Sequence, residues 1–352
     1  GEVTLLTGSL SVRSRRDALE SISSGSTRIV VGTHALIQEA VAFDELGIVV
    51  IDEQHRFGVK QRMAISDREG RIPDILVMSA TPIPRSLAMA LYGDLDLSLL
   101  DEMPPGRKPV TTSLRSTDHR TAVYEFVRSE IAMGRQAYIV YPLVDDSEKI
   151  DLLSAKREFE RLSSEVFLEE RVGLIHGQLA SAEKDSVMRE FITGKIDILV
   201  ATTVIEVGID VPNASVMLIE HAERFGLSQL HQLRGRVGRG TAESHCILGA
   251  EPGETALERL RIFRDTSDGF EVARADLQIR GQGDLFGSQQ HGRDPALRFA
   301  DLLLDEDLLV DAQSEARALV EEDPELERAD HAAIQAHLEG LYKHRLAMFR
   351  VG

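Results

Sequence analysis

The residues IVVIDEQH, 48–55, give the clearest indication of the fold class. They set four consecutive β-branched residues directly before a pair of carboxylates. A strand that is apolar at every position is typically buried on both faces, as in a parallel sheet covered by helices on both sides. We therefore expect residues 48–52 to form a buried strand of an α/β protein, with Asp52 and Glu53 at its carboxyl end.

Similar apolar runs recur along the chain, separated by amphipathic segments long enough to be helices. One such segment extends from about Asp118 to Met133 and stops at Gly134; another begins near Ser181, which we expect to cap it, and stops at Gly194. This alternation predicts a doubly wound α/β architecture. The expected strands are residues 29–32, 48–52, 75–79, 138–141, 172–176, 196–201, 216–220 and 246–248.

Two changes in the pattern suggest the domain limits. The stretch DEMPPGRKP, residues 101–109, combines three prolines, a glycine and four charges, which is typical of a linker. After about residue 253 no strand pattern remains, and the chain reads as helices broken by glycines and then as acidic amphipathic helices. We expect a first α/β domain over residues 1–104, a second over 105–253, and a helical hairpin with a helical tail over 254–352.

Composition restricts the function without deciding it. The 352 residues carry a net charge of −18, which by itself argues against a nucleic-acid partner. However, residues 301–352 account for −8 of this charge. The rest of the chain contains basic clusters at Arg13, Arg15 and Arg16, at Arg56, Lys60 and Arg62, and at Arg234, Arg236 and Arg239.

The remaining composition favours a cytoplasmic protein. The single cysteine, Cys246, lies in an apolar run, so we expect a buried thiol and no disulfide within the chain. We find no signal peptide and no apolar stretch long enough to cross a membrane. Because residue 1 is Gly, we expect the chain to be a piece of a longer protein.

The carboxylates after the first strand suggest phosphate chemistry. Ligands of open α/β sheets bind at the carboxyl ends of the strands. There, Asp52 and Glu53 could hold Mg²⁺ through water and orient an attacking water molecule. The alternative is a solvated turn between strand and loop. The next strand ends in SATPIPR, residues 79–85, whose hydroxyl groups are more often simple turn formers.

A second group of candidate residues is rich in arginine. In QLRGRVGR, residues 232–239, Arg236 and Arg239 are three positions apart and would share one face of a helix. Such a pair suits the charge that develops on a transferred phosphoryl group. Upstream, in ATTVIEVGIDVP, residues 201–212, Gly208 allows close backbone approach and Asp210 could accept a ribose hydroxyl. Taken alone, the arginines could equally form a solvated basic face.

Together these motifs resemble those of superfamily 2 helicases. DEQH (52–55), SATPIPR (79–85), ATTVIEVGIDVP (201–212) and QLRGRVGR (232–239) resemble motifs II, III, V and VI, in the same order. Within that superfamily, GTHALIQ (32–38), DEQHRFGVKQR (52–62) and YGDLDLSLLDEMPPGRKP (92–109) look like the RecG family. The resemblance implies two RecA-like domains, the first truncated, and an ATP-dependent motor that remodels stalled forks and Holliday junctions.

The resemblance also implies site residues. The nucleotide residues would be Asp52, Glu53, His55, Gln232, Arg236 and Arg239, with Gly208 and Asp210 beside the nucleotide. Contacts with the phosphates of double-stranded DNA would come from Thr33, His34 and Thr202, to which we add Arg85. DGFEVARADLQIRGQGDLFGSQQHG, residues 268–292, is similar to the TRG element that couples ATP state to movement on duplex DNA, and its coupling residues would be Arg259, Arg280 and Gln290. Without the resemblance, the glycine-rich stretch around Arg280 reads as a surface loop.

One expected motif is missing. No G-x-x-x-x-G-K-[ST] phosphate-binding loop occurs in the sequence, so we expect the chain alone to bind ATP weakly and to hydrolyse it negligibly. Two other functions stay open: a transcription-repair coupling translocase and a non-catalytic DNA- or protein-binding fragment. We expect branched DNA as the partner, with single-strand-binding protein as a further candidate, a monomer, and a bacterial, nucleoid-associated location.

Overall fold

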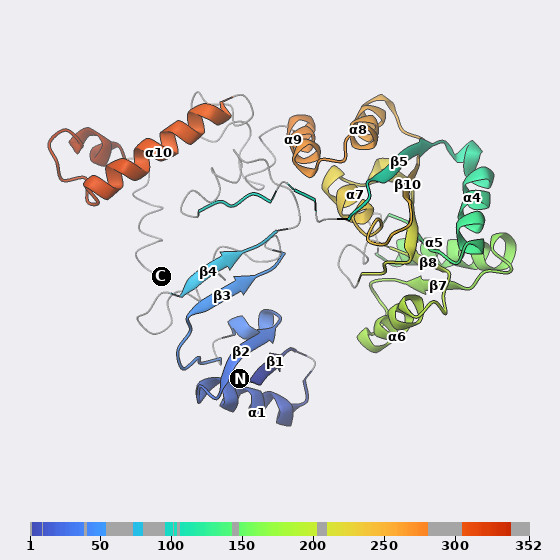
Figure 1. Ribbon diagram of the computed structural model, residues 1–352, viewed down its shortest axis with the longest axis horizontal. Coiled ribbons are helices and arrows are strands. Elements are labelled where there is room, and N and C mark those ends of the chain that lie inside the picture. Colours follow the sequence, from blue (N-terminus) through green and yellow to red (C-terminus); the bar gives the residue numbers. More distant parts are fainter. Residues whose placement is uncertain are drawn as a thin grey trace. The chain divides into compact units, whose positions relative to one another are not determined.

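The computed structural model describes residues 2–8, 10–38, 41–53, 73–79, 96–100, 102–103, 106–142, 148–202, 210–280 and 305–338. Contacts divide the chain into two compact units. The first comprises Gly1–Ala80 with Ala316–Gly352, and the second comprises Thr81–Glu315. Figure 1 shows the elements of both units.

The second unit is built on a six-stranded sheet in which every strand pair is parallel. The strand order is β5-β10-β9-β6-β8-β7, so each neighbouring pair requires a crossover connection. The strands are β5 (Val110–Arg115), β6 (Gln136–Val140), β7 (Val172–Ile175), β8 (Ile198–Ala201), β9 (Ala214–Glu220) and β10 (Ser244–Gly249).

Helices cover both faces of this sheet. Alternate side chains of the central strands accordingly belong to two separate cores, one on each face. Ala137 and Ile139 of β6 join the core that contains Val123 and Val127 of α4 (Arg120–Ala132). Tyr138 belongs to the core on the opposite face. That core contains side chains of α6 (Ser181–Ile192), α7 (Leu227–Arg234), α8 (Glu254–Asp265) and α9 (Gly269–Arg280). The predicted doubly wound α/β class is therefore confirmed.

The first unit contains two small parallel sheets. One pairs β1 (Glu2–Leu6) with β2 (Thr27–Gly32) and packs on α1 (Val12–Ser23); the other pairs β3 (Ile48–Ile51) with β4 (Asp74–Val77). The expectation that residues 48–51 are buried on both faces is wrong for β3. Ile48 is 61% and Val50 55% exposed, while Ile51 is buried. The strand thus has one covered face in this structure.

The predicted strands all form, each within one or two residues of its expected bounds, but β1 and β5 were not predicted. Helices α4 and α6 end as expected, with Gly134 and Gly194 in the left-handed conformation that glycine adopts easily. The predicted cap at Ser181 is wrong. Ala180 precedes the helix, and its amide donates to the Glu183 carboxylate over 3.0 Å, which leaves Ser181 as the first helical residue.

The helical region after residue 253 is also present. Helices α8 and α9 follow the sheet, and α10 (Glu306–Glu322) crosses the division between the units at Ala316. Within the part of the chain that the structure describes, no helix combines the length and apolarity needed to cross a membrane. The domain limits at residues 104 and 253 remain predictions.

Candidate functional site

The acidic pair follows β3, as its sequence indicated. The Asp52 side chain is exposed, and its Oδ1 accepts the Glu53 backbone amide at 2.8 Å. Glu53 has a φ of 54°, in the left-handed region that costs a non-glycine residue about 1–3 kcal/mol. Such strain is characteristic of functional turns. An exposed carboxylate at a strand end fits a hard cation such as Mg²⁺.

The GTHALIQ segment forms a second turn in the first unit. The Thr33 amide donates to the Leu6 carbonyl at 3.3 Å, and His34 begins a short 3-10 helix, His34–Ile37. Gly32 is required here because a Cβ at this position would lie 2.2 Å from the Leu6 carbonyl oxygen. Thr33 and His34 therefore sit at the carboxyl end of β2.

Two buried polar side chains follow the neighbouring strands β7 and β8 at the carboxyl edge of the large sheet. The Thr202 amide donates to the Ile175 carbonyl at 3.3 Å, so Thr202 lies beside His176, the residue that follows β7. Thr202 is 1% and His176 5% exposed. Within the described residues, the Thr202 Oγ1 and the His176 Nδ1 have no hydrogen-bond partner. A buried polar atom without a hydrogen bond costs free energy of folding, so these two atoms are suited to bind a ligand or water.

Two lysines and one glutamate lie near His176. Burial lowers the pKa of His176, the nearby Lys156 and Lys184 lower it further, and Glu183 opposes the effect of the lysines. Lys184 also donates to the Gly177 carbonyl at 2.6 Å. Sequence reasoning predicted Thr202 but missed His176, because a single histidine after an apolar run gives no distinct signal.

The arginine loop, residues 235–240, lies at the opposite, amino edge of the same sheet. Arg239 forms an ion pair with Asp210, and Asp210 lies just before β9. Asn213 of that segment accepts the amide of Gln136, the first residue of β6, at 3.0 Å, which identifies the amino edge. The structure thus brings together two predicted site residues that are 29 positions apart.

Close packing holds this loop in place. Gly238 has a φ of 80°, and a Cβ there would lie 2.7 Å from a methyl group of Val110. A Cβ on Gly240 would lie 2.2 Å from the Pro212 carbonyl oxygen. The two glycines therefore allow the loop to fit between the start of β5 and the segment before β9.

A further arginine in the same motif has a different environment. Arg234 is only 5% exposed, and its Nη1 donates to the Phe263 carbonyl at 3.0 Å and the Thr266 carbonyl at 2.7 Å. Its guanidinium also stacks on the Phe263 ring, 4.1 Å from the centroid. The basic cluster of the sequence therefore separates into one buried, structural arginine and the two of the loop.

The other predicted residues of the second unit lie on neighbouring elements. Gln232 is on α7, and the Arg236 amide donates to the Leu233 carbonyl at 3.0 Å. Burial raises the pKa of Tyr138 on β6 to about 12, while Arg236 and Arg239 oppose that rise, so both cations lie near this strand.

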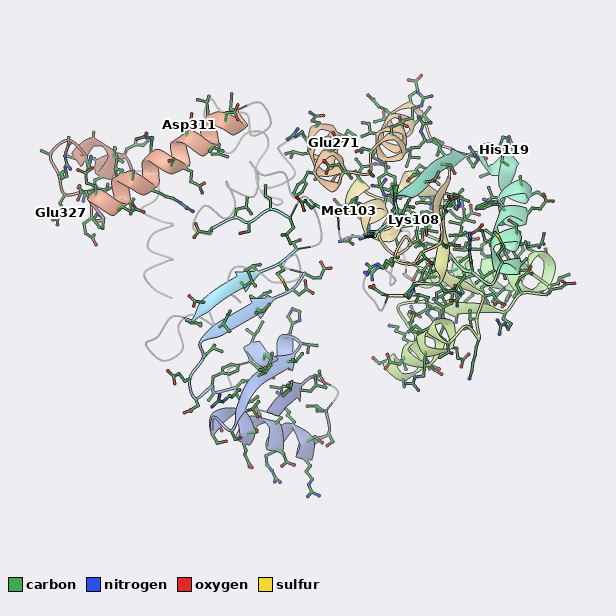
Figure 2. The ribbon with its side chains drawn as sticks, in the orientation of Figure 1. Met103, Lys108, His119, Glu271, Asp311 and Glu327 are labelled. Carbon is green, nitrogen blue, oxygen red and sulfur yellow. The ribbon has the colours of Figure 1, made fainter. Side chains whose placement is uncertain are left out.

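Arg259 of α8 donates to the Glu223 carbonyl at 2.5 Å, and Arg280 is the last residue of α9. The predicted residues His55, Arg85, Gly208 and Gln290, and the side chain of Arg280, lie outside the described residues. Figure 2 shows the described side chains, including Lys108 beside the start of β5. In the described ranges, no group of three or more acidic, histidine or cysteine side chains is arranged to bind a metal.

Comparisons with known proteins agree with this arrangement. A DEAD/DEAH box helicase model matches residues 2–90, a helicase conserved C-terminal domain matches residues 118–241, and domain 3, C-terminal, of the ATP-dependent DNA helicase RecG matches residues 266–350. The fold and these matches define a helicase-type chain of parallel α/β sheets.

The relatives identify the type of helicase. ATP-dependent DNA helicase RecG of Thermotoga maritima is 54% identical over 92% of this chain and 41% of its own length. The Bacillus subtilis RecG is 48% identical over 96% of this chain and 49% of its own length. A solved structure of RecG bound to a three-way DNA junction has a TM-score of 0.67 and 52% identity, covering 87% of this chain and 39% of that one. Over most of its length the chain is therefore similar to the RecG type of ATP-dependent DNA helicase, and it spans about half the length of these relatives or less.

Proposed function

We propose that this chain forms the ATP-responsive part of a motor that moves along double-stranded DNA at branched structures. The proposal rests on one observation: the candidate residues of the second unit lie at opposite edges of one sheet. Asp210 and Arg239 pair at the amino edge, whereas Thr202 and His176 lie at the carboxyl edge. The second unit could then bind a different ligand at each edge of its sheet. A movement caused by one ligand would displace the residues that bind the other.

We assign the amino edge to the nucleotide. Arg236 and Arg239 would stabilise the charge on the transferred phosphoryl group, with Gln232 sensing the nucleotide. Asp52 and Glu53 of the first unit would hold Mg²⁺ through water and orient the attacking water molecule. Bound Mg²⁺ would neutralise phosphate charge in this reaction. The proposed domains are residues 1–104, 105–253 and 254–352.

We assign the carboxyl edge to DNA. Thr202 and His176, together with Thr33 and His34 of the first unit, are suited to contact phosphates, because their hydroxyl, imidazole and amide groups bind oxygen without reading base sequence. Arg259, with the predicted coupling residues Arg280 and Gln290, would link ATP state to movement. The RecG solved with a three-way junction supports branched DNA as the substrate. We further propose a cytoplasmic monomer, with single-strand-binding protein as a candidate partner.

Replacement of Glu53 tests the catalytic assignment. In a complete helicase that carries this sequence, Glu53→Gln should reduce DNA-stimulated phosphate release by a factor on the order of 10²–10⁴. ATP binding, measured by fluorescence titration, should persist because glutamine has nearly the same shape. Glu20→Gln is the control, since Glu20 is exposed on α1 of the same unit and pairs with Arg16 at 3.8 Å. Undiminished hydrolysis in Glu53→Gln would remove Glu53 from this role.

The chain by itself provides a second comparison. It lacks the phosphate-binding loop motif, so we expect negligible ATP hydrolysis from it with or without DNA. Forked and linear duplexes, compared in an electrophoretic shift assay, should distinguish a DNA-binding piece from one that binds no DNA. Turnover of the isolated chain equal to that of the complete helicase would refute the assignment of the phosphate contacts.

A further inference from the structure

The end of the 101–109 linker contacts the arginine loop of the second unit. Arg107 is half-buried, and its Nη2 donates to the Gly235 carbonyl at 3.2 Å. Gly235 directly follows the last residue of α7. A linker residue 128 positions away in sequence thus reaches the base of the loop that carries the candidate catalytic arginines.

The same carbonyl accepts a second guanidinium. The Arg239 Nε donates to the Gly235 oxygen at 2.9 Å, and Arg239 also pairs with Asp210. The carbonyls at the end of a helix lack partners within the helix and carry partial negative charge. The Gly235 carbonyl is therefore well suited to bind cations, and here it joins Arg107 to Arg239.

We call the shared contact of Arg107 and Arg239 with the Gly235 carbonyl the joint, and its charges influence one another. Burial lowers the pKa of Arg107, the neighbouring cation Arg239 lowers it further, and Asp210 opposes both effects. Two guanidinium groups on one carbonyl repel each other, so the arrangement is held by the surrounding structure. The packing of Gly238 against Val110 provides that support, because Val110 begins β5 three residues after Arg107.

We propose that Arg107 is a positioning residue that fixes the arginine loop to the end of the linker and so sets the position of Arg236 and Arg239. The part of this inference that concerns the loop rests on the contacts of the second unit alone. The part that concerns catalysis rests on the proposed function. Arg107 itself need not touch the nucleotide, since it acts through the Gly235 carbonyl.

Hydrogen exchange of the loop amides tests the joint in this chain. The Arg236 amide donates to the Leu233 carbonyl and the Val237 amide to the Arg234 carbonyl, so both report on loop opening. Arg107→Gln should accelerate their exchange roughly tenfold, the lower end of the effect of losing a hydrogen bond from a charged group. Arg107→Lys, which keeps the charge, should give a smaller increase. Lys108→Gln, an exposed neighbour with the same change of charge, should leave exchange unaltered.

Kinetics of the complete helicase separate positioning from simple destabilisation. Arg107→Gln should lower kcat for DNA-stimulated ATP hydrolysis by roughly 10- to 100-fold, the effect of misplaced catalytic groups, with KM for ATP within about twofold of the parent. Arg107→Lys should recover part of kcat. An equal loss in kcat for both variants, or a loss confined to KM, would overturn the catalytic part.

Hydrogen exchange tests whether Arg107 holds the arginine loop, whatever the kinetics show. Loop exchange in Arg107→Gln equal to that of the parent chain would overturn the proposal. If Arg107→Gln opens the whole sheet, Arg107→Lys decides: an increase confined to the loop supports the joint, and an equal increase in β6 and β9 refutes it. An inactive parent helicase with loop-confined exchange would refute the proposed function and leave the joint intact.

Discussion

Replacement of Arg234 by methionine tests whether the helices after the sheet depend on one buried cation. Arg234 joins α7 to the end of α8, since it donates to the Phe263 and Thr266 carbonyls and stacks on the Phe263 ring. Methionine keeps an apolar chain of similar length and fills most of the space. The substitution therefore removes the polar contacts while limiting the cavity.

The expected loss of stability is about 3 kcal/mol. Hydrogen bonds to a charged group contribute about 1.5–3 kcal/mol each, and the cation over the ring contributes about 1–2 kcal/mol when desolvated. Methionine offsets part of this loss, because burial lowers the pKa of Arg234 and so penalises its charge in the folded state. For a unit of this size, 3 kcal/mol corresponds to a fall in Tm of about 6–12 °C.

The measurement is thermal unfolding of this chain followed by near-ultraviolet circular dichroism. The chain has no tryptophan, and four of its five tyrosines belong to the second unit, so the tyrosine signal reports mainly on that unit. Arg224→Met is the matched control, because Arg224 is exposed in the same unit; it should change the free energy of unfolding by less than about 0.5 kcal/mol. A Tm of Arg234→Met within 2 °C of the control, roughly what 1 kcal/mol produces, would show that the two carbonyls find other partners and that the reasoning is wrong.

Two further predictions concern the same region. Gly240→Ala should lower the Tm of the second unit and release the Arg239–Asp210 pair, because the added Cβ would meet the Pro212 carbonyl oxygen at 2.2 Å. Crystallography or loop hydrogen exchange should detect this change. Gly253→Ala is the control, because a Cβ at Gly253 has nothing within 4 Å. Burial, together with the cations Arg234 and Arg107, lowers the pKa of His231 to about 4. Its unfolded pKa is near 6.5, so above about pH 6.5 this histidine does not lower the free energy of unfolding. As pH falls towards 4, the free energy of unfolding should decrease by up to about 3 kcal/mol, because the unfolded state takes up the proton first. His231→Gln should remove this part of the pH dependence in urea titrations, and an unchanged pH profile would contradict the assignment.

The sequence predicted the central strands because their apolar runs are strong local signals. It missed β5, which contains the hydroxyl residues of VTTSLR and lies at the edge of the sheet, where apolar burial is incomplete. It also missed β1, at the first described residues. Burial on both faces was the wrong inference for β3, because local composition does not specify which tertiary layers cover a strand.

The site was predictable as a set of motifs but not as an arrangement. The spacing of Arg236 and Arg239 indicated a shared role, whereas nothing in the pattern distinguished Arg234, which is buried and structural. The prolines of the linker indicate only a domain boundary, and they carry no signal for the contact of Arg107 with Gly235. Such contacts join residues more than a hundred positions apart and depend on the finished fold.

The placement of Thr202 and Asp210 gives the physical reason why one motif can serve two ligands. They are eight positions apart in sequence, yet Thr202 follows β8 at the carboxyl edge and Asp210 precedes β9 at the amino edge. The two ends of the motif therefore lie at opposite edges of the same sheet, at β8 and β9, with β6 between these two strands. Asp210, which pairs with Arg239, is thus separated from Thr202 by only seven residues of the chain. Under the proposed function, this connection would make contact with DNA phosphates respond to the state of the nucleotide without any change in the sheet itself.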